Sequence, residues 1–225
     1  MNIKIIYEDQ NIIILDKPTN MLSHAAKFHS GNDILSELGH REYATITRLD
    51  YQTSGLMLIG KTKSATSALN HLAMASQIHK TYEAIVSGYF STPENTMTAY
   101  LLKDEKNSVV RLSNNKIPNS LMITTKYRVI TEKNGFSHIS IDLLSGRTHQ
   151  IRAHMAFLEH PVAGDPLYGN IHLNKKMKLK TQALVSMQIA FDIPNENDML
   201  HYLDKKAFIK PDFPYKDILE KQWSV

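Results

Sequence analysis

The sequence predicts an α+β domain with a mixed, largely antiparallel central sheet that is flanked by helices and loops. Short apolar runs rich in β-branched residues outnumber the helical stretches along the chain. Most of these runs follow one another through polar turns rather than through crossover helices, which favours antiparallel pairing. With 225 residues and a hydrophobic content of 42%, the chain is long enough to bury the core of such a fold. We expect one catalytic domain over residues 1–225.

The N-terminal residues predict a hairpin followed by a loop. Residues 3–6 and 12–15 are apolar runs separated by a polar turn, which is typical of a β-hairpin. Pro18 ends the second run because proline has no N–H to give to a sheet. The polar stretch over residues 21–42 predicts a loop around one short helix near residues 33–38.

The next segment predicts a buried strand and an amphipathic helix. Residues 56–59, Leu-Met-Leu-Ile, form a continuous apolar run. Residues 64–77 then place apolar side chains on one helical face, with Thr62 or Ser64 as the N-cap. A strand is expected over residues 80–90, where β-branched and aromatic residues are bounded by a glycine.

The second half of the chain continues with strands and short helices. Residues 96–130 predict two or three strands joined by polar turns. Alternating apolar residues predict a strand over residues 139–143, and a change to helical spacing predicts a helix over residues 147–160 that Pro161 ends. A further strand is expected over residues 183–191, and a C-terminal helix over residues 214–223.

Composition restricts the chemistry that this chain can perform. It has no cysteine, which excludes disulfides, thiolate zinc sites and cysteine nucleophiles. A net charge of +4 and a pI of about 9.0 lean weakly toward a polyanionic partner. The start of the sequence does not read as a signal peptide, and no apolar run has the length that crosses a bilayer. We therefore expect a cytoplasmic protein without membrane contact.

A polar segment with a carboxylate precedes the buried strand at residues 56–59. Arg48 lies two residues before Asp50, and Thr53-Ser54-Gly55 leads directly into the strand. Adjacent opposite charges of this kind most often form a solvated surface turn. The alternative is a reactive carboxylate held at the rigid edge of a sheet.

Two further segments hold candidate functional residues. Arg147 lies at the start of a predicted helix, where the macrodipole favours anions, so we expect it to reach toward an anion such as Asp50 or a phosphate. Tyr82 lies on a predicted strand, where a tyrosine usually packs but can leave its hydroxyl accessible. His149 and His154 are five residues apart, on different helix faces, so their spacing does not predict a metal site.

These segments together resemble the RluA-type family of RNA pseudouridine synthases. The stretch "TRLDYQTSGLMLIGKT" is similar to the family's catalytic motif, "KTYEAIVSG" to its second motif and "SGRTHQIRAHMAFLEHPVAGDPLYG" to its third. The segment "IIYEDQNIIILDKPTNMLSH" resembles the strand hairpin and Lys-Pro turn with which the family opens. The resemblance spans roughly residues 4–191, in the family's own order, and implies the pseudouridine synthase fold.

The resemblance implies an isomerase that detaches uracil from ribose C1′, rotates it and rejoins it through C5. The catalytic residues it implies are Asp50, Tyr82 and Arg147, with Arg147 paired to the aspartate. No metal and no organic cofactor are expected, because the reaction transfers no phosphoryl group and involves no redox change. Further substrate or RNA contacts are implied for Arg48, Thr53, Ser54, Gly55, His149, Gln150, Arg152 and the apolar pocket residue Leu184.

The expected substrates are uridines in ribosomal large-subunit RNA, in transfer RNA or in both. Such a base must be flipped out of the RNA, and Arg48 is a candidate to occupy the vacated place. The lysine-rich segment over residues 175–180 is a candidate for phosphate contacts, although such a run is often only a solvated face. We expect a monomer. Because the resemblance begins near residue 4, we also expect no N-terminal S4-like RNA-binding domain.

Three positions depart from the family pattern. Asn20 replaces a glycine after the Lys-Pro turn, which asparagine tolerates because it adopts left-handed backbone conformations. Thr47 replaces a histidine, a change that bears on substrate choice more than on activity, and Val185-Ser186 replaces His-Ala. Two other functions stay open: a catalytically silent RNA-binding or RNA-chaperone protein, and a histidine-based nuclease.

Overall fold

The structure of the chain is a computed structural model that describes residues 3–24, 33–104 and 109–223. The chain divides into two compact units. Unit 1 comprises Met1–Thr81 and Val185–Asp212, and unit 2 comprises Tyr82–Leu184 and Phe213–Val225. One boundary between the units therefore falls within a strand, β5 (Ile78–Ser87).

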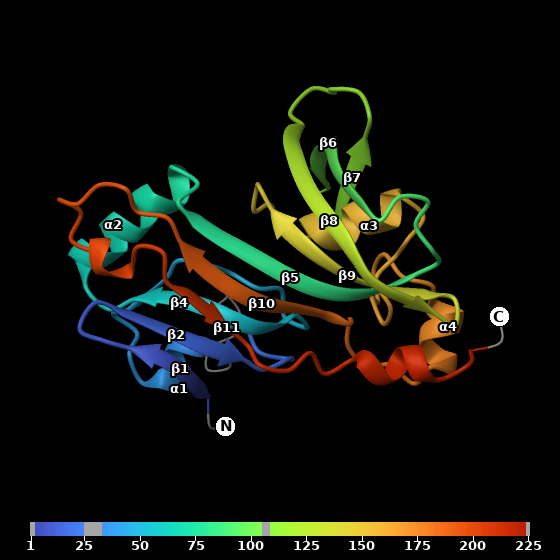
Figure 1. The fold of residues 1–225 in the computed structure, drawn as a ribbon, viewed down its shortest axis with the longest axis horizontal. Helices are drawn as coiled ribbons and strands as arrows, with labels where there is room; N and C mark the ends of the chain where they lie inside the picture. The colour runs from blue at the N-terminus through green and yellow to red at the C-terminus, as the bar shows by residue number, and fades with distance from the viewer. Residues whose placement is uncertain (1–2, 25–32, 105–108, 224–225) are drawn as a thin grey trace. The chain divides into compact units, whose positions relative to one another are not determined.

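Unit 1 is built on strands that come from both ends of the sequence (Figure 1). The predicted hairpin is confirmed, since β1 and β2 pair antiparallel, and β2 then pairs antiparallel with β4. On its other side β4 pairs parallel with β10, which makes the sheet mixed as predicted. The two short strands β3 and β11 add to β4 and β10, respectively. The strand bounds are β1 Lys4–Glu8, β2 Ile12–Lys17, β3 Ala44–Thr45, β4 Ser54–Gly60, β10 Leu184–Phe191 and β11 Ala207–Ile209.

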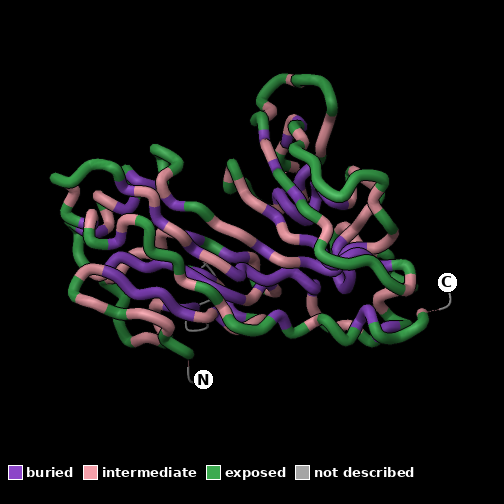
Figure 2. The backbone as a smooth tube through the Cα atoms, viewed as in Figure 1, coloured by how far each residue is buried: buried purple, intermediate pink, exposed green. Residues whose placement is uncertain are grey.

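The helices of unit 1 begin where the sequence places capping residues. Helix α1 (Ile34–Leu38) starts at Asp33, whose carboxylate accepts a hydrogen bond from the N–H of Ser36. Helix α2 (Lys63–Met74) starts at Thr62, whose hydroxyl accepts from the N–H of Ala65. The apolar face of α2 packs with β2, β4 and β10 into one core, and these strands show continuous buried runs in Figure 2. A short 3₁₀ turn, η1 (His201–Leu203), closes the same core with Leu203.

Unit 2 contains an antiparallel run of four strands in the order β9, β8, β6, β7 (Figure 1). Helix α3 packs on these strands through Ala153, which lies in a cluster with apolar residues of β6, β7 and β8. Two further short helical turns, α4 and η2, complete the unit. The bounds are β6 Glu94–Asp104, β7 Val109–Ser113, β8 Leu121–Lys133, β9 Phe136–Leu143, α3 Gln150–Phe157, α4 Ile171–Lys176 and η2 Lys216–Glu220.

The structure confirms most of the predicted elements, shortens two of the predicted helices, and adds helix α4 and the short strands β3 and β11, which were not predicted. The helix expected over residues 147–160 starts later, at Gln150, because the preceding residues form a turn. The helix expected over residues 214–223 is the shorter 3₁₀ turn η2, which buries Ile218 and Leu219. Helix α4 was not predicted, since it buries none of its side chains and so has no apolar periodicity.

Two findings concern features that the sequence singled out. Asn20 has φ 60°, so the left-handed conformation expected at this position is confirmed. Among the described residues, none of the helices has the length and apolar content that crossing a membrane requires.

Gly55 lies where two strands of unit 1 approach each other closely. It has φ +111°, and it lies opposite Ser186 where β4 and β10 pair. A Cβ atom at this position would lie 2.2 Å from the carbonyl oxygen of Ser186 and 2.6 Å from its nitrogen. Because both atoms belong to the backbone, no side-chain rotation relieves the overlap. The glycine of Thr53-Ser54-Gly55 is therefore required by strand packing.

The variant Gly55→Ala tests this packing requirement. We expect it to lower the free energy of unfolding by about 3 kcal/mol or more, since backbone strain adds to overpacking. The matched control is Gly39→Ala, at φ +74° with no atom within 4 Å of the added Cβ. That control carries only the backbone cost of about 1–2 kcal/mol. Chemical denaturation of both variants measures the difference, and equal losses would contradict the proposed overlap.

Candidate active site

Asp50 lies on a turn at the entrance to the buried strand β4. The N–H of Thr53 donates to the carbonyl oxygen of Asp50 at 3.0 Å, which closes the turn immediately before β4 begins at Ser54. Asp50 is half-buried, whereas Arg48 beside it is exposed. A carboxylate is thus presented at the rigid end of a strand that is buried along most of its length.

The backbone on the N-terminal side of Asp50 is fixed by two hydroxyl groups. Ser23 Oγ donates to the carbonyl oxygen of Leu49 at 2.6 Å and accepts from the N–H of the same residue at 2.9 Å. Thr47 Oγ1 accepts from the N–H of Leu58 at 2.8 Å and so attaches the same segment to β4. Both hydroxyl-bearing residues are buried. Thr47, which replaces the family histidine, therefore has a structural role in this chain.

The C-terminal side of Asp50 is fixed by the buried ammonium group of Lys17. Its Nζ donates to the carbonyl oxygens of Pro18 at 2.9 Å, Met21 at 2.8 Å and Tyr51 at 3.3 Å. Lys17 is fully buried, and this burial lowers the pKa of its ammonium from about 10.5 to about 8. The negative charge of Asp50 opposes that decrease. A buried cation therefore links the end of β2 to the Asp50 turn.

Tyr82 and Leu184 are buried residues at the two ends of a chain segment that belongs to unit 2. Tyr82 is on β5 and is 6% exposed, and Leu184 is the first residue of β10 and is 3% exposed. The neighbouring backbone is well fixed, because the N–H of Ile85 donates to the carbonyl of Ala183, and the N–H of Ala163 donates to the carbonyl of Ile85. Tyr82 thus belongs to a strand that backbone hydrogen bonds attach to Ala163 and Ala183.

Arg147 is exposed on a turn between β9 and α3. The N–H of Arg147 donates to Oε1 of Gln150, and the N–H of Gln150 donates to the carbonyl of Arg147, each at 3.1 Å. The buried amide of Gln150 also donates to the carbonyl of Thr124 and to Oγ1 of Thr125 in β8. Gln150 therefore anchors the turn to β8 and leaves the guanidinium of Arg147 toward solvent.

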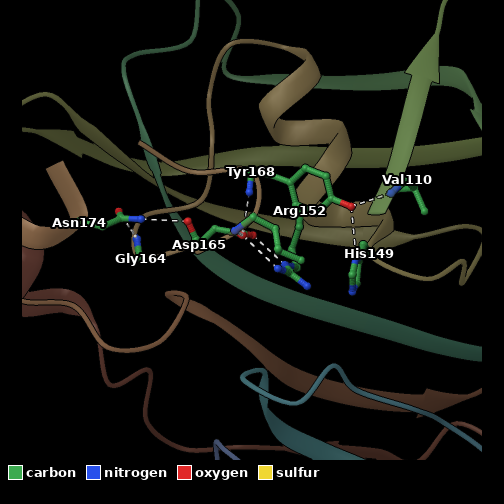
Figure 3. Close-up of polar contacts among 8 residues, drawn as sticks. Val110, His149, Arg152, Gly164, Asp165, Tyr168 and Asn174 are labelled. Carbon is green, nitrogen blue, oxygen red and sulfur yellow. Dashed lines mark hydrogen bonds and ion pairs between the residues drawn. The ribbon is translucent and has the colours of Figure 1, made fainter. Parts of the chain in front are cut away.

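A polar network connects the start of α3 with the loop that follows it (Figure 3). The hydroxyl of Tyr168 accepts from the N–H of Val110 in β7 at 2.8 Å and lies 3.0 Å from Nδ1 of His149. His149 has φ 54° and precedes the first residue of α3. The guanidinium of Arg152 lies over the Tyr168 ring, 5.3 Å from its centroid. Tyr168 thereby holds the left-handed residue from which α3 starts.

The centre of this network is a buried ion pair. Arg152 Nε donates to Oδ2 of Asp165 at 2.7 Å, and Arg152 Nη2 donates to Oδ1 at 3.0 Å (Figure 3). Asp165 has no exposed surface, and Arg152 is 4% exposed. The Asp165 carboxylate also accepts from the N–H groups of Leu167 and Tyr168. This bidentate geometry, together with the backbone donors, offsets the cost of burying both charges.

The residues predicted as functional divide between the two units. Unit 1 contains Asp50, Arg48 and the residues Thr53 to Gly55, and unit 2 contains the others. In unit 2, Gln150 and Arg152 are buried and their polar atoms bond within the protein. Among the predicted residues, Arg48 and Arg147 are exposed, and Asp50, Ser54 and His149 are half-buried.

Sequence reasoning did not assign roles to four residues that the structure places at these turns. They are Lys17, Ser23, Asp165 and Tyr168. A lysine as the last residue of β2, two positions after its apolar run, is an available signal, since charged residues are rarely buried unless they are paired. Ser23 gives no such signal, because its partner is distant in sequence. In the part of the chain that the structure describes, no three His, Asp or Glu side chains gather as a metal cluster.

The attraction between Lys17 and Asp50 is directly measurable. In Asp50→Asn the pKa of Lys17 should fall below its value of about 8, because the negative charge that supports the ammonium is lost. NMR titration of lysine labelled at Cε and Nζ reports this value. Asp192→Asn, at an exposed ion pair with Lys205, is the matched control and should leave the Lys17 titration unchanged. An unaltered Lys17 pKa in Asp50→Asn would contradict the interaction.

The buried ion pair predicts a large stability difference between two conservative variants. Asp165→Asn should lower the free energy of unfolding by about 3 kcal/mol or more, since it leaves the buried Arg152 without its counter-charge. Asp217→Asn is the control, because its partner Lys221 is 3.8 Å away and both side chains are exposed. Its effect should stay within about 0.5 kcal/mol. Equal effects in chemical denaturation would show that the Arg152–Asp165 pair does not anchor the loop.

Comparison with known proteins identifies the fold and the family of this chain. A family model described as RNA pseudouridylate synthase matches residues 11–157. Human RNA Pseudouridylate Synthase Domain Containing 1 has a similar fold, with a TM-score of 0.78 at 19% identity, covering 99% of this chain and 88% of that chain. The human Domain Containing 4 protein gives a TM-score of 0.71 at 18% identity, covering 94% of this chain and 88% of that chain. The predicted pseudouridine synthase fold is confirmed.

Relatives at higher identity are longer than this chain. An uncharacterized RNA pseudouridine synthase of Mycoplasma genitalium is 34% identical over 206 residues, which cover 84% of this chain and 63% of that protein. Ribosomal large subunit pseudouridine synthase D of Pseudomonas aeruginosa is 32% identical over 177 residues, which cover 75% of this chain and 54% of that protein. The chain thus spans between 54% and 63% of the length of these two relatives. It belongs to the RNA pseudouridylate synthase family and to the RluA type within it.

Proposed function

We propose that this protein converts uridine to pseudouridine in RNA, with Asp50 as the catalytic carboxylate. The observation that carries the proposal is the Asp50 turn. It lies in the segment that resembles the family's catalytic motif, and its backbone is held on both sides by hydrogen bonds from Ser23 and Lys17. A reactive carboxylate needs this kind of fixed presentation, because small displacements from the attack geometry are costly.

The proposed reaction exchanges one bond at ribose C1′ for another. The bond from C1′ to N1 of uracil breaks, and Asp50 acts as a nucleophile at C1′ or assists elimination while it stabilises positive charge there. The base then rotates, C5 bonds to C1′, and the proton on C5 is removed while N1 gains one. We assign Tyr82 to stacking against the uracil and to proton transfer, and Arg147 to pairing with the Asp50 carboxylate.

The proposed substrates are uridines in ribosomal large-subunit RNA, in transfer RNA or in both. One relative carries the name ribosomal large subunit pseudouridine synthase D, which supports the first class. A uridine in folded RNA must leave its stack before a carboxylate reaches its ribose, at a cost of a few kcal/mol. Arg48 is exposed directly beside the Asp50 turn. We therefore propose that its side chain fills the place that the flipped uracil leaves in the base stack, or that it binds a flanking phosphate.

Pseudouridine mapping at single-nucleotide resolution tests the function and names the substrate together. Ribosomal and transfer RNA are taken from cells that lack the gene, complemented with the wild type, with Asp50→Ala or with Asp217→Asn. We expect at least one site to vanish in the deletion strain and to return with the wild type and the surface control Asp217→Asn. Asp50→Ala should restore none of the lost sites.

Two results would reject the proposal. If no site changes in the deletion strain, the chain does not modify these RNAs and a silent RNA-binding role takes its place. If Asp50→Ala restores every site, the carboxylate is not catalytic. Shortened RNA products after incubation with the purified protein would instead indicate a nuclease.

A further inference from the structure

We propose that Ser23 is a positioning residue for Asp50, whose carboxylate it keeps oriented by fixing the backbone of Leu49. The inference rests on the proposed function, because it concerns how Asp50 performs that reaction. It assigns a role to a side chain outside the stretch that contains Asp50 itself. We expect Ser23 not to contact the substrate, so its loss should change kcat rather than KM.

The Ser23 hydroxyl both donates a hydrogen bond to Leu49 and accepts one from it. It donates to the carbonyl oxygen of Leu49 at 2.6 Å and accepts from the Leu49 N–H at 2.9 Å. Ser23 is 3% exposed, and the Leu49 side chain is 7% exposed. Leu49 lies between β3 and β4, outside any strand. A single buried hydroxyl therefore supplies the pair of hydrogen bonds that a neighbouring strand would otherwise offer.

This clamp acts at the residue directly before Asp50. On the other side, the carbonyl oxygen of Tyr51 accepts from the N–H of Met21 and from Nζ of Lys17, each at 3.3 Å. Asp50 thus lies between two residues that the same N-terminal segment holds. If the clamp at Leu49 is released, the nearest remaining upstream anchor is Thr47, three residues before Asp50, and the Asp50 backbone can shift. A displacement of about 1 Å from the attack geometry can reduce turnover about a hundredfold.

Ser23 has a matched counterpart in the other unit. Ser137 has no exposed surface, and its hydroxyl donates to the carbonyl oxygen of Gly88 at 2.7 Å and lies 2.9 Å from Glu132 Oε1. It belongs to β9 of unit 2, whereas Asp50 belongs to unit 1. Loss of either hydroxyl leaves buried polar groups with fewer partners. Only the loss of Ser23 should release the Asp50 turn.

The test compares Ser23→Ala, Ser23→Thr and Ser137→Ala with the wild type. The substrate is the RNA that pseudouridine mapping identifies, and the readouts are kcat, KM, Tm and amide hydrogen exchange at Leu49. We expect Ser23→Ala to lower kcat by about 10- to 100-fold, with KM changed by less than about twofold. Exchange at the Leu49 amide should accelerate by about tenfold or more, because its acceptor is gone.

The two companion variants separate positioning from general stability. Ser23→Thr retains the hydroxyl and should recover kcat to within about threefold of the wild type. Ser137→Ala should lower Tm by a similar amount to Ser23→Ala, yet leave kcat within about twofold of the wild type. Exchange at the Leu49 amide should remain unchanged in Ser137→Ala.

Three outcomes would overturn the proposal. Unchanged Leu49 exchange in Ser23→Ala would show that the clamp does not hold the turn, whether or not the protein is active. Faster exchange with wild-type kcat would show that the clamp does not position Asp50. An equal loss of kcat in Ser137→Ala would make the effect one of stability. Failure of the proposed function is distinguished by the wild type, which would then form no pseudouridine in any RNA.

Discussion

The Asp50 turn depends most on the hydrogen bonds that the buried ammonium group of Lys17 donates to backbone carbonyl oxygens. Lys17 ends β2 with its charge inside the protein, where three backbone carbonyl oxygens accept hydrogen bonds from its ammonium group. Burying a cation is costly unless its donors are satisfied, so the carbonyl of Tyr51 has to face Lys17. The ladder between β2 and β4 sets where Lys17 lies, because Lys17 is opposite Gly55 in that register. The strand pairing thus determines the position of the charge, and the charge determines the turn.

The same logic recurs in unit 2 with the opposite sign of charge. The buried carboxylate of Asp165 gathers the guanidinium of Arg152 and two backbone N–H groups around it. The segment over residues 161–170 has little regular structure, and its course follows from satisfying this carboxylate. Tyr168 then reaches both β7 and the start of α3. In each unit, one buried charge with a full set of partners fixes a loop that packing alone leaves undetermined.

Local sequence patterns predicted the regular elements because those elements depend on neighbours in the chain. The apolar run of β4, the hairpin at the N-terminus and the capped helix α2 each carry their own signal. The short strands β3 and β11 carry none, since they have two and three residues and form by adding to an existing edge. The parallel pairing of β4 with β10 joins distant parts of the chain. The one sequence feature that this pairing requires is Gly55. The reason for the glycine becomes clear only from the structure, because a Cβ atom there would overlap the backbone of Ser186.

The candidate site shows a second limit of motif similarity. The motif "SGRTHQIRAH" contains two arginines for which the resemblance implied functional roles, Arg147 in catalysis and Arg152 in substrate or RNA contact, yet Arg147 is exposed and Arg152 is buried against Asp165. Resemblance implied RNA contacts for both Gln150 and Arg152, whereas their hydrogen bonds lie inside the protein. A sequence motif contains both the residues that the fold requires and the residues that the chemistry requires, and the motif alone does not distinguish them. Burial separates them: Gln150 and Arg152 form their hydrogen bonds inside the protein, whereas the guanidinium groups of Arg48 and Arg147 are exposed.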